Sequence, residues 1–222
     1  MDSHGRRIFL RGAALGAVGL AAAGKEKEAE DVSTMEDLMR EHGVLKRVLL
    51  IYREAMRLID ANEKLPVEPL AGSAKLIRSF IEGYHEKLEE DYLFPRFRKA
   101  GKLTDLVDVL TLQHQKGRVV TAHILQLANS GATKDAGQRR ALRDSMHQFV
   151  RMYEPHEARE DTVLFPAFHE LVSRSEYDAL GEEFEKKEHQ LFGGDGFEKA
   201  VDEVARLEKA LGIYDLSQFT PK

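Results

Sequence analysis

The chain has 222 residues, of which 42% are hydrophobic, and a formal net charge of −5. This length accommodates one domain or at most two, with enough apolar side chains for one sizeable core. The acidic balance argues against nucleic acid as a partner. The chain has no cysteine, which excludes thiolate ligands, iron–sulfur clusters and covalently attached haem, so any metal site must use nitrogen and oxygen ligands.

Residues 1–23 differ in composition from the rest of the chain. Two adjacent arginines, Arg6 and Arg7, precede an uncharged stretch that contains three alanines ending at Ala23. This arrangement resembles a twin-arginine export signal, and the apolar stretch is shorter than the roughly 20 residues that a membrane anchor needs. We therefore expect cleavage after Ala23, a flexible leader over residues 24–32, export to the periplasm and no membrane attachment of the mature protein.

The spacing of apolar residues predicts four amphipathic helices, over residues 33–61, 70–92, 102–128 and 136–162. Each carries one histidine on its apolar face: His42, His85, His114 and His156. We expect Pro95 to close the second helix and Pro155 to kink the fourth, because proline lacks the backbone donor that a helix needs.

Two further helices are predicted near residues 175–190 and 196–211, and no segment has the alternation typical of a strand. The sequence therefore predicts an all-α protein. Residues 33–170 are expected to form an up-down-up-down four-helix bundle, and residues 171–222 a helical extension that packs on it.

Two segments of the chain share one pattern. His85 and Glu89 are followed by Leu93-Phe94-Pro95, and His156 and Glu160 by Leu164-Phe165-Pro166. A histidine and a glutamate four residues apart lie about 40° apart around a helix, so both side chains reach a common point.

The remaining two histidines stand at matching distances upstream. His42 precedes His85 by 43 residues and His114 precedes His156 by 42, so the pattern repeats with an offset of 71 to 72 residues. In a bundle of alternating direction, this pattern collects four imidazoles and two carboxylates at one level. Imidazole and carboxylate suit iron, zinc or manganese, and bridging carboxylates can hold two metals close together.

The motif H…HxxxE…H…HxxxE resembles that of hemerythrin-like proteins of the HHE cation-binding family, over roughly residues 33–170. The resemblance implies two iron ions joined by an oxo or hydroxo bridge, with manganese or zinc less favoured. It makes these side chains the metal ligands: His42, His85, Glu89, His114, His156 and Glu160. It also implies a small diatomic or peroxide ligand and an electron donor as partners, in a monomer or small homo-oligomer.

One departure from the family bears on function. Oxygen-carrying hemerythrins have a second histidine on the third helix, four residues after the first, where this chain has Arg118. The missing imidazole favours reduction of oxygen, peroxide or nitric oxide over reversible oxygen binding. A sensor, or a protein that stores or donates iron, is the alternative. A ferritin-like carboxylate enzyme ranks low, because only Glu82 and His85 fit its Glu-x-x-His pattern.

Two ligand assignments have alternatives one residue further along the chain. Asp161 follows His156 by five residues and is an alternative to Glu160, and Glu90 stands in the corresponding position beside Glu89. In a regular helix the fifth residue points about 140° away, which favours the two glutamates at the fourth position.

Several other side chains are candidates for supporting roles. Tyr153 and Tyr92 are possible pocket residues that could bond to a bound ligand, or ordinary core aromatics. Phe94 and Phe165 are expected to close the bundle end and keep the site dry. Four further histidines are not expected to be ligands: His123, His147, His169 and His189.

Overall fold

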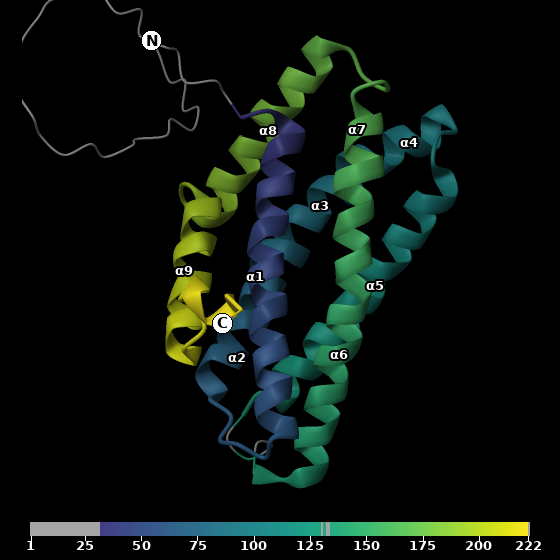
Figure 1. Cartoon of the computed structure of the whole chain (residues 1–222). Coiled ribbons are helices and arrows are strands. Elements are labelled where there is room, and N and C mark those ends of the chain that lie inside the picture. The colour runs from purple at the N-terminus through teal and green to yellow at the C-terminus, as the bar shows by residue number, and fades with distance from the viewer. Residues whose placement is uncertain (1–31, 130, 132–133, 222) are drawn as a thin grey trace, which may run out of the picture.

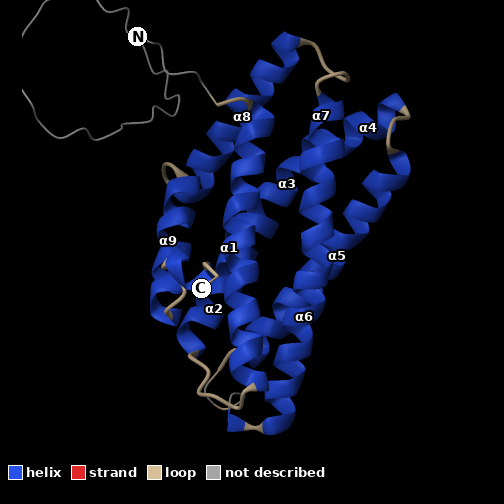
Figure 2. Cartoon of the chain, viewed as in Figure 1, coloured by secondary structure: helices blue, strands red, loops and turns tan. Residues whose placement is uncertain are grey.

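The computed structural model describes residues 32–129, 131 and 134–221 (Figure 1). The predicted export signal and nearly all of the leader lie outside these described residues. Within the described part every regular element is a helix and no strand occurs, so the prediction of an all-α fold is confirmed (Figure 2). None of the described helices combines the length and the apolar character that crossing a membrane requires.

The α-helices follow in chain order as α1 (Thr34–Asp60), α2 (Val67–Leu76), α3 (Glu86–Leu88), α4 (Phe94–Ala100), α5 (Thr104–Leu127), α6 (Ala136–Arg159), α7 (Phe165–Phe168), α8 (Arg174–Phe192) and α9 (Gly196–Leu211). Three π-helical segments join some of them: η1 (Ile77–His85), η2 (Glu89–Leu93) and η4 (Glu160–Leu164). A 3₁₀ turn, η5 (Leu216–Phe219), lies near the C-terminus.

The π-helical segments make continuous rods out of shorter helices. The elements from α2 to α4 form one rod, and α6, η4 and α7 form another. Together with α1 and α5 they make four rods, in which α1 contacts α2 and α6, and α5 contacts the same two helices. This closed ring of contacts is a four-helix bundle, and its long axes run side by side in Figure 1.

Pro95 does not close the second helix, contrary to the sequence prediction. The chain remains helical to Ala100 and ends at Gly101, whose φ of 63° suits the left-handed end of a helix. Pro95 sits in the first turn of α4, where a missing N–H is tolerated. Just before it, the Phe94 N–H bonds to the Glu89 carbonyl five residues back, which is the wider turn of a π-helix.

The second copy of the motif behaves in the same way. The Phe165 N–H bonds to the Glu160 carbonyl, and Pro166 follows in the first turn of α7. Helix α6 continues past Pro155 to Arg159, and the change from α to π geometry starts at Glu160. In both copies a π-helical segment therefore starts at the glutamate of the His-x-x-x-Glu pair, not at a proline, and the first copy has a further π-helical segment, η1, before this pair.

The two C-terminal helices cover one side of the bundle. Helix α9 packs on α1 and α2, and α8 packs on α1 (Figure 1). Helix α8 has Ser173 as its N-cap, so it begins slightly before the predicted range of residues 175–190. Tyr177 ties it to the start of α1, because its hydroxyl accepts from the Met35 N–H and its carbonyl accepts from the Thr34 hydroxyl.

The N-cap of α9 provides a test of this arrangement. The Asp195 carboxylate accepts from the Glu198 N–H, and removing an N-cap side chain typically costs about 1 kcal/mol. We expect Asp195→Ala to lower the free energy of unfolding by that amount in urea denaturation. Asp202→Ala, at an exposed position inside the same helix, is the control and should cause no loss. Equal effects of the two substitutions would contradict the assigned cap.

Candidate metal centre

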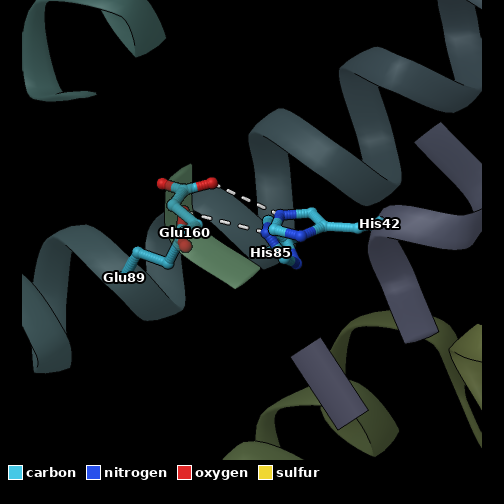
Figure 3. Close-up of side chains that lie close together, drawn as sticks. All are labelled: His42, His85, Glu89 and Glu160. Carbon is cyan, nitrogen blue, oxygen red and sulfur yellow. Dashed lines mark ion pairs between the residues drawn. The ribbon is translucent and has the colours of Figure 1, made fainter. Parts of the chain in front are cut away.

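The six predicted ligands converge in the interior of the bundle. The four rods supply one histidine each, from α1, η1, α5 and α6, and the two glutamates open η2 and η4. All six side chains are buried, with at most 4% of any residue exposed. Figure 3 shows four of them, His42, His85, Glu89 and Glu160, pointing toward one another.

The ligand atoms form two groups that share a carboxylate. In the first, His42, His85, Glu89 and Glu160 each offer an atom within 4.8 Å of the others, and in the second His114, His156 and Glu160 do so. Glu89 also lies between the imidazole pairs, since one of its oxygens is 3.8 Å from His85 Nε2 and 3.4 Å from His114 Nε2. Both glutamates are thus in position to bridge two ions.

The residues present fit a pair of cations. His85 Nε2 and all four carboxylate oxygens of Glu89 and Glu160 are buried, and none has a hydrogen-bond partner among the residues that the structure describes. Leaving buried ionisable groups unpaired is costly, and a cation between them removes that cost. His114 Nε2 and His156 Nε2 are 3.2 Å apart. Two nitrogens bound at about 2.1 Å to one ion are separated by roughly 3 Å when they meet it at a right angle.

Without a cation, the two carboxylates do not ionise equally. Burial and the neighbouring charge of Glu160 raise the pKa of Glu89 well above its usual value. Burial acts in the same direction on Glu160, but the His156 and His42 imidazoles lower its pKa well below normal. A divalent cation between them favours the ionised form of both carboxylates.

The imidazoles show a similar imbalance. Burial lowers the pKa of His42, but the adjacent carboxylates of Asp161 and Glu160 outweigh it and raise the pKa to about 10. Burial and the charge of His42 lower the pKa of His85 well below normal. The pKa values of these two imidazoles are thus moved in opposite directions, although their ring centroids lie only 4.6 Å apart. Metal binding requires both to be neutral.

A second layer of polar side chains holds every imidazole at its Nδ1 atom. The Nδ1–oxygen distances are 2.7 Å for His42 and Asp161, 2.8 Å for His85 and Glu41, 3.1 Å for His114 and Glu90, and 2.9 Å for His156 and Gln113. An oxygen acceptor at Nδ1 keeps the hydrogen there and leaves the Nε2 lone pair for a metal. All four Nε2 atoms lie within 3.8 Å of a carboxylate oxygen of the centre.

The two alternative ligands belong to this second layer. Asp161 contacts His42 at Nδ1, and Glu90 contacts His114 at Nδ1, on the sides of the rings away from the shared carboxylates. Glu160 and not Asp161 is the carboxylate that joins both groups of ligand atoms. The fourth residue after His156 therefore points into the centre and the fifth does not, as expected from a regular helix, although this turn is π-helical.

The two tyrosines have different surroundings. Tyr153 is buried with its ring edge toward His156, at a centroid distance of 5.3 Å, and its hydroxyl donates to Glu86 at 2.6 Å. Tyr92 instead turns to α8, where its hydroxyl donates to Glu183 at 3.3 Å. Tyr153 lies beside the centre as one of the two sequence interpretations has it, and Tyr92 faces the C-terminal extension.

Arg118, which stands where the oxygen carriers have a further histidine, points its guanidinium at the second layer. It lies 2.8 Å from Glu86 and 2.7 Å from Glu90. Neither Glu86 nor Glu41 was singled out from the sequence, because nothing in their spacing distinguishes them from surface glutamates. Gln113 was missed as well, although it directly precedes His114 as Glu41 precedes His42.

The remaining candidates do not contribute ligand atoms. His123, His147, His169 and His189 are all exposed. The two repeated phenylalanines are fully buried, as the expectation of a dry site requires, and each stacks on an imidazole. Phe165 lies 5.6 Å from His42 and Phe94 lies 5.4 Å from His114, measured between ring centroids.

A cavity of about 690 Å³ lies between α1 and α8. Its lining includes Leu38, Tyr84 and Glu41, which neighbour the ligands His42 and His85 in the chain. Glu41 also bonds to His85, so its side chain connects the cavity to the centre.

The contacts around the centre occur in two copies related by the repeat. Lys46 lies 3.1 Å from Glu157, and their counterparts Arg118 and Glu86 are 2.8 Å apart. The stacked phenylalanines and the Asp161 and Glu90 contacts pair in the same way. The bundle thus places two similar halves around one centre.

The sequence matches the family model described as "Hemerythrin HHE cation binding domain" twice, over residues 33–135 and 105–219. Three uncharacterised proteins, one from Mycobacterium bovis (strain ATCC BAA-935 / AF2122/97) and two from Mycobacterium tuberculosis (strains CDC 1551 / Oshkosh and ATCC 25618 / H37Rv), are each 54% identical to it over 190 residues. These alignments cover 86% of this chain and 74% of each relative. No solved structure matches the chain.

The second layer gives a prediction for the metal-free protein at acid pH. Burial alone raises the pKa of Glu90, but hydrogen bonds with His114, Lys87 and Arg118 lower it to about 2. Since the unfolded value is about 4.3, ionised Glu90 contributes stability that is lost as the pH falls from about 4.3 to about 2. Glu90→Gln should therefore lose less unfolding free energy than the wild type across this window, in denaturation curves at stepped pH. The exposed Asp91→Asn is the control, and an unchanged slope for Glu90→Gln would refute the assignment.

Gly117 gives a second prediction, because it leaves room for the tyrosine hydroxyl. A Cβ atom at Gly117 would lie 2.0 Å from Tyr153 Oη. Gly117→Ala should therefore displace the tyrosine and lower the free energy of unfolding by about 1–3 kcal/mol, the usual cost of overpacking. Adding Tyr153→Phe should recover part of this loss. Gly43→Ala in α1, where nothing lies within 4 Å, is the matched control and should cause no loss.

Proposed function

Since the chain belongs to the hemerythrin HHE cation-binding family, we propose that it is a non-haem diiron protein that binds or reduces a small oxidant: oxygen, peroxide or nitric oxide. The observation that carries the proposal is the pair of buried carboxylates, Glu89 and Glu160, whose unpartnered oxygens lie between two pairs of imidazoles. A single ion does not need two shared carboxylates, whereas two adjacent ions do.

The donor set supports iron as the metal. It offers four imidazole nitrogens and two carboxylates, which suit iron, manganese or zinc. Each ion would be held by two histidines and a share of two carboxylates, a set small enough to leave room for a further ligand. Iron bound in this way supplies one-electron redox chemistry and a place for a small ligand to bind.

The protein side chains hold the ligands, exclude water and offer a proton. Four oxygen acceptors fix the imidazoles at Nδ1, and Phe94 and Phe165 cover two of the rings. The Tyr153 hydroxyl is a buried proton donor on this side of the centre, where it bonds to Glu86 and its ring lies beside His156. Reduction of peroxide, oxygen or nitric oxide consumes protons, so such a donor suits turnover.

The surroundings of Arg118 favour reaction over oxygen transport. Its guanidinium pairs with Glu86 and Glu90, so α5 offers only His114 as an imidazole of the centre. The histidines then divide two and two, and neither ion is filled by a third imidazole. Two iron ions held by this ligand set would each have room for an oxidant and could each supply an electron to it.

A second candidate function is a sensor of oxidants. The cavity between α1 and α8 touches Glu41, which bonds to His85, so a change at this histidine has a short path to the C-terminal extension. For either function we propose export to the periplasm, on the strength of the arginine pair and apolar stretch in residues 1–23.

Metal analysis of the full chain tests the proposal. We expect about two iron ions per chain in protein purified under iron-replete conditions, and an absorption spectrum that changes on addition of oxygen, peroxide or nitric oxide. His85→Ala and His156→Ala should each lower the iron content, because each removes one of two imidazoles at one ion. The exposed His147→Ala is the control and should keep the wild-type content.

Two outcomes would contradict the proposal. Zinc, or no metal, in iron-replete protein would remove the redox function. A stable reversible oxygen adduct without turnover would make the protein a carrier despite its missing fifth histidine.

A further inference from the structure

The side chains that hold the Nδ1 atoms of the imidazoles differ between the two halves of the centre. His85 and His156 are counterparts in the repeat, and so are the residues that hold them, Glu41 and Gln113, which are 72 positions apart. The contacts have the same form: Glu41 Oε2 lies 2.8 Å from His85 Nδ1, and Gln113 Oε1 lies 2.9 Å from His156 Nδ1. Glutamate and glutamine have nearly the same shape, so the difference between the halves is one of charge.

The other two histidines differ in the same direction. His42 has Asp161 at 2.7 Å from its Nδ1. His114 has Glu90 at 3.1 Å, a longer contact. The Glu90 carboxylate also binds two cations, since Arg118 and Lys87 each lie 2.7 Å from it. These two cations largely neutralise the negative charge of Glu90, so its effect on the His114 imidazole is weaker.

A carboxylate at Nδ1 makes an imidazole a stronger metal ligand. It draws the Nδ1 hydrogen toward itself, which increases electron density at Nε2, and its charge attracts the cation directly. A neutral amide orients the ring without either effect. Changes of partner in this outer layer typically alter metal affinity by about 10–100-fold.

We propose that the two metal positions are unequal: the position at His42 and His85 binds its cation tightly, and the position at His114 and His156 binds weakly and exchanges its cation. Glu41 and Gln113 are the positioning residues that set this order. The inference rests on the two-metal centre of the proposed function, but not on its redox activity. It identifies the His114–His156 position as the one that is filled last and emptied first.

Titration of the metal-free full chain with Co²⁺ tests the order, because calorimetry resolves the binding steps and the visible spectrum of Co²⁺ reports its ligands. We expect two steps whose dissociation constants differ by about 10-fold or more. His85→Ala should abolish the tight step and leave the weak one, and His156→Ala should do the reverse. Loss of the tight step in His156→Ala would overturn the proposed order.

Reciprocal exchange of the two positioning residues supplies a sharper test. Gln113→Glu should tighten the weak step by about 10-fold, and Glu41→Gln should weaken the tight step by a similar factor. The double exchange should restore two unequal steps in the opposite order, so that His156→Ala now abolishes the tight one. Matched controls change charge on the same helices at exposed positions, Gln115→Glu on α5 and Glu36→Gln on α1, and should leave both steps unchanged.

The possible results distinguish the inferred inequality of the two metal positions from the proposed redox function. Two equal steps in the wild type, or steps that do not respond to Gln113→Glu in a protein with unchanged circular dichroism, would overturn the inference. Unequal Co²⁺ steps with no reaction of the iron-loaded protein toward oxidants would overturn the proposed function and support the inference. Equal steps with normal reaction would do the opposite, and absence of Co²⁺ binding would refute the centre and the inference together.

Discussion

The fold of this chain depends on burying four imidazoles and two carboxylates in the interior of a helical bundle. Such groups are costly to bury without partners, and five of their atoms have none within the described residues. The second layer satisfies each Nδ1 atom but leaves the facing Nε2 atoms and the Glu89 and Glu160 oxygens directed at one another. The proposed pair of cations would resolve this conflict, which makes the metal centre and the bundle core parts of one energetic arrangement.

The π-helical segments give this arrangement its register. Two of the three, η2 and η4, begin at Glu89 and Glu160, and each of these two is followed by a proline in the first turn of the next α-helix. A π turn carries an extra residue and is often found at functional sites, where it redirects side chains without ending the helix. The Leu-Phe-Pro sequences mark these turns. The phenylalanine at the end of each turn stacks on an imidazole of a different rod: Phe94 stacks on His114, and Phe165 stacks on His42.

Much of the centre could be predicted from the sequence because helices make spacing informative. A histidine and a glutamate four residues apart share a helical face, and a repeated pattern implies equivalent positions. Pro95 was interpreted wrongly because a proline in the first turn of a continuing helix has the same local sequence as one that ends it. The outward turn of Tyr92 could not be foreseen either, since it depends on α8, whose placement no local spacing encodes.

The second layer was the part least accessible from the sequence. Glu86, Glu41 and Gln113 make their contacts across helices, between residues 43 to 67 positions apart. One signal was present, because Glu41 and Gln113 each directly precede a ligand histidine in the two copies of the repeat. That signal becomes informative only when the copies are compared and found to differ by a single charge.

We propose that two metal ions lie between the imidazole pairs and share Glu89 and Glu160. Crystals of the iron-loaded protein, measured on both sides of the iron absorption edge, test this arrangement. We expect two anomalous peaks, one beside His42 and His85 and the other beside His114 and His156, both next to the Glu89 and Glu160 carboxylates. A single peak, or peaks outside this group of side chains, would contradict it.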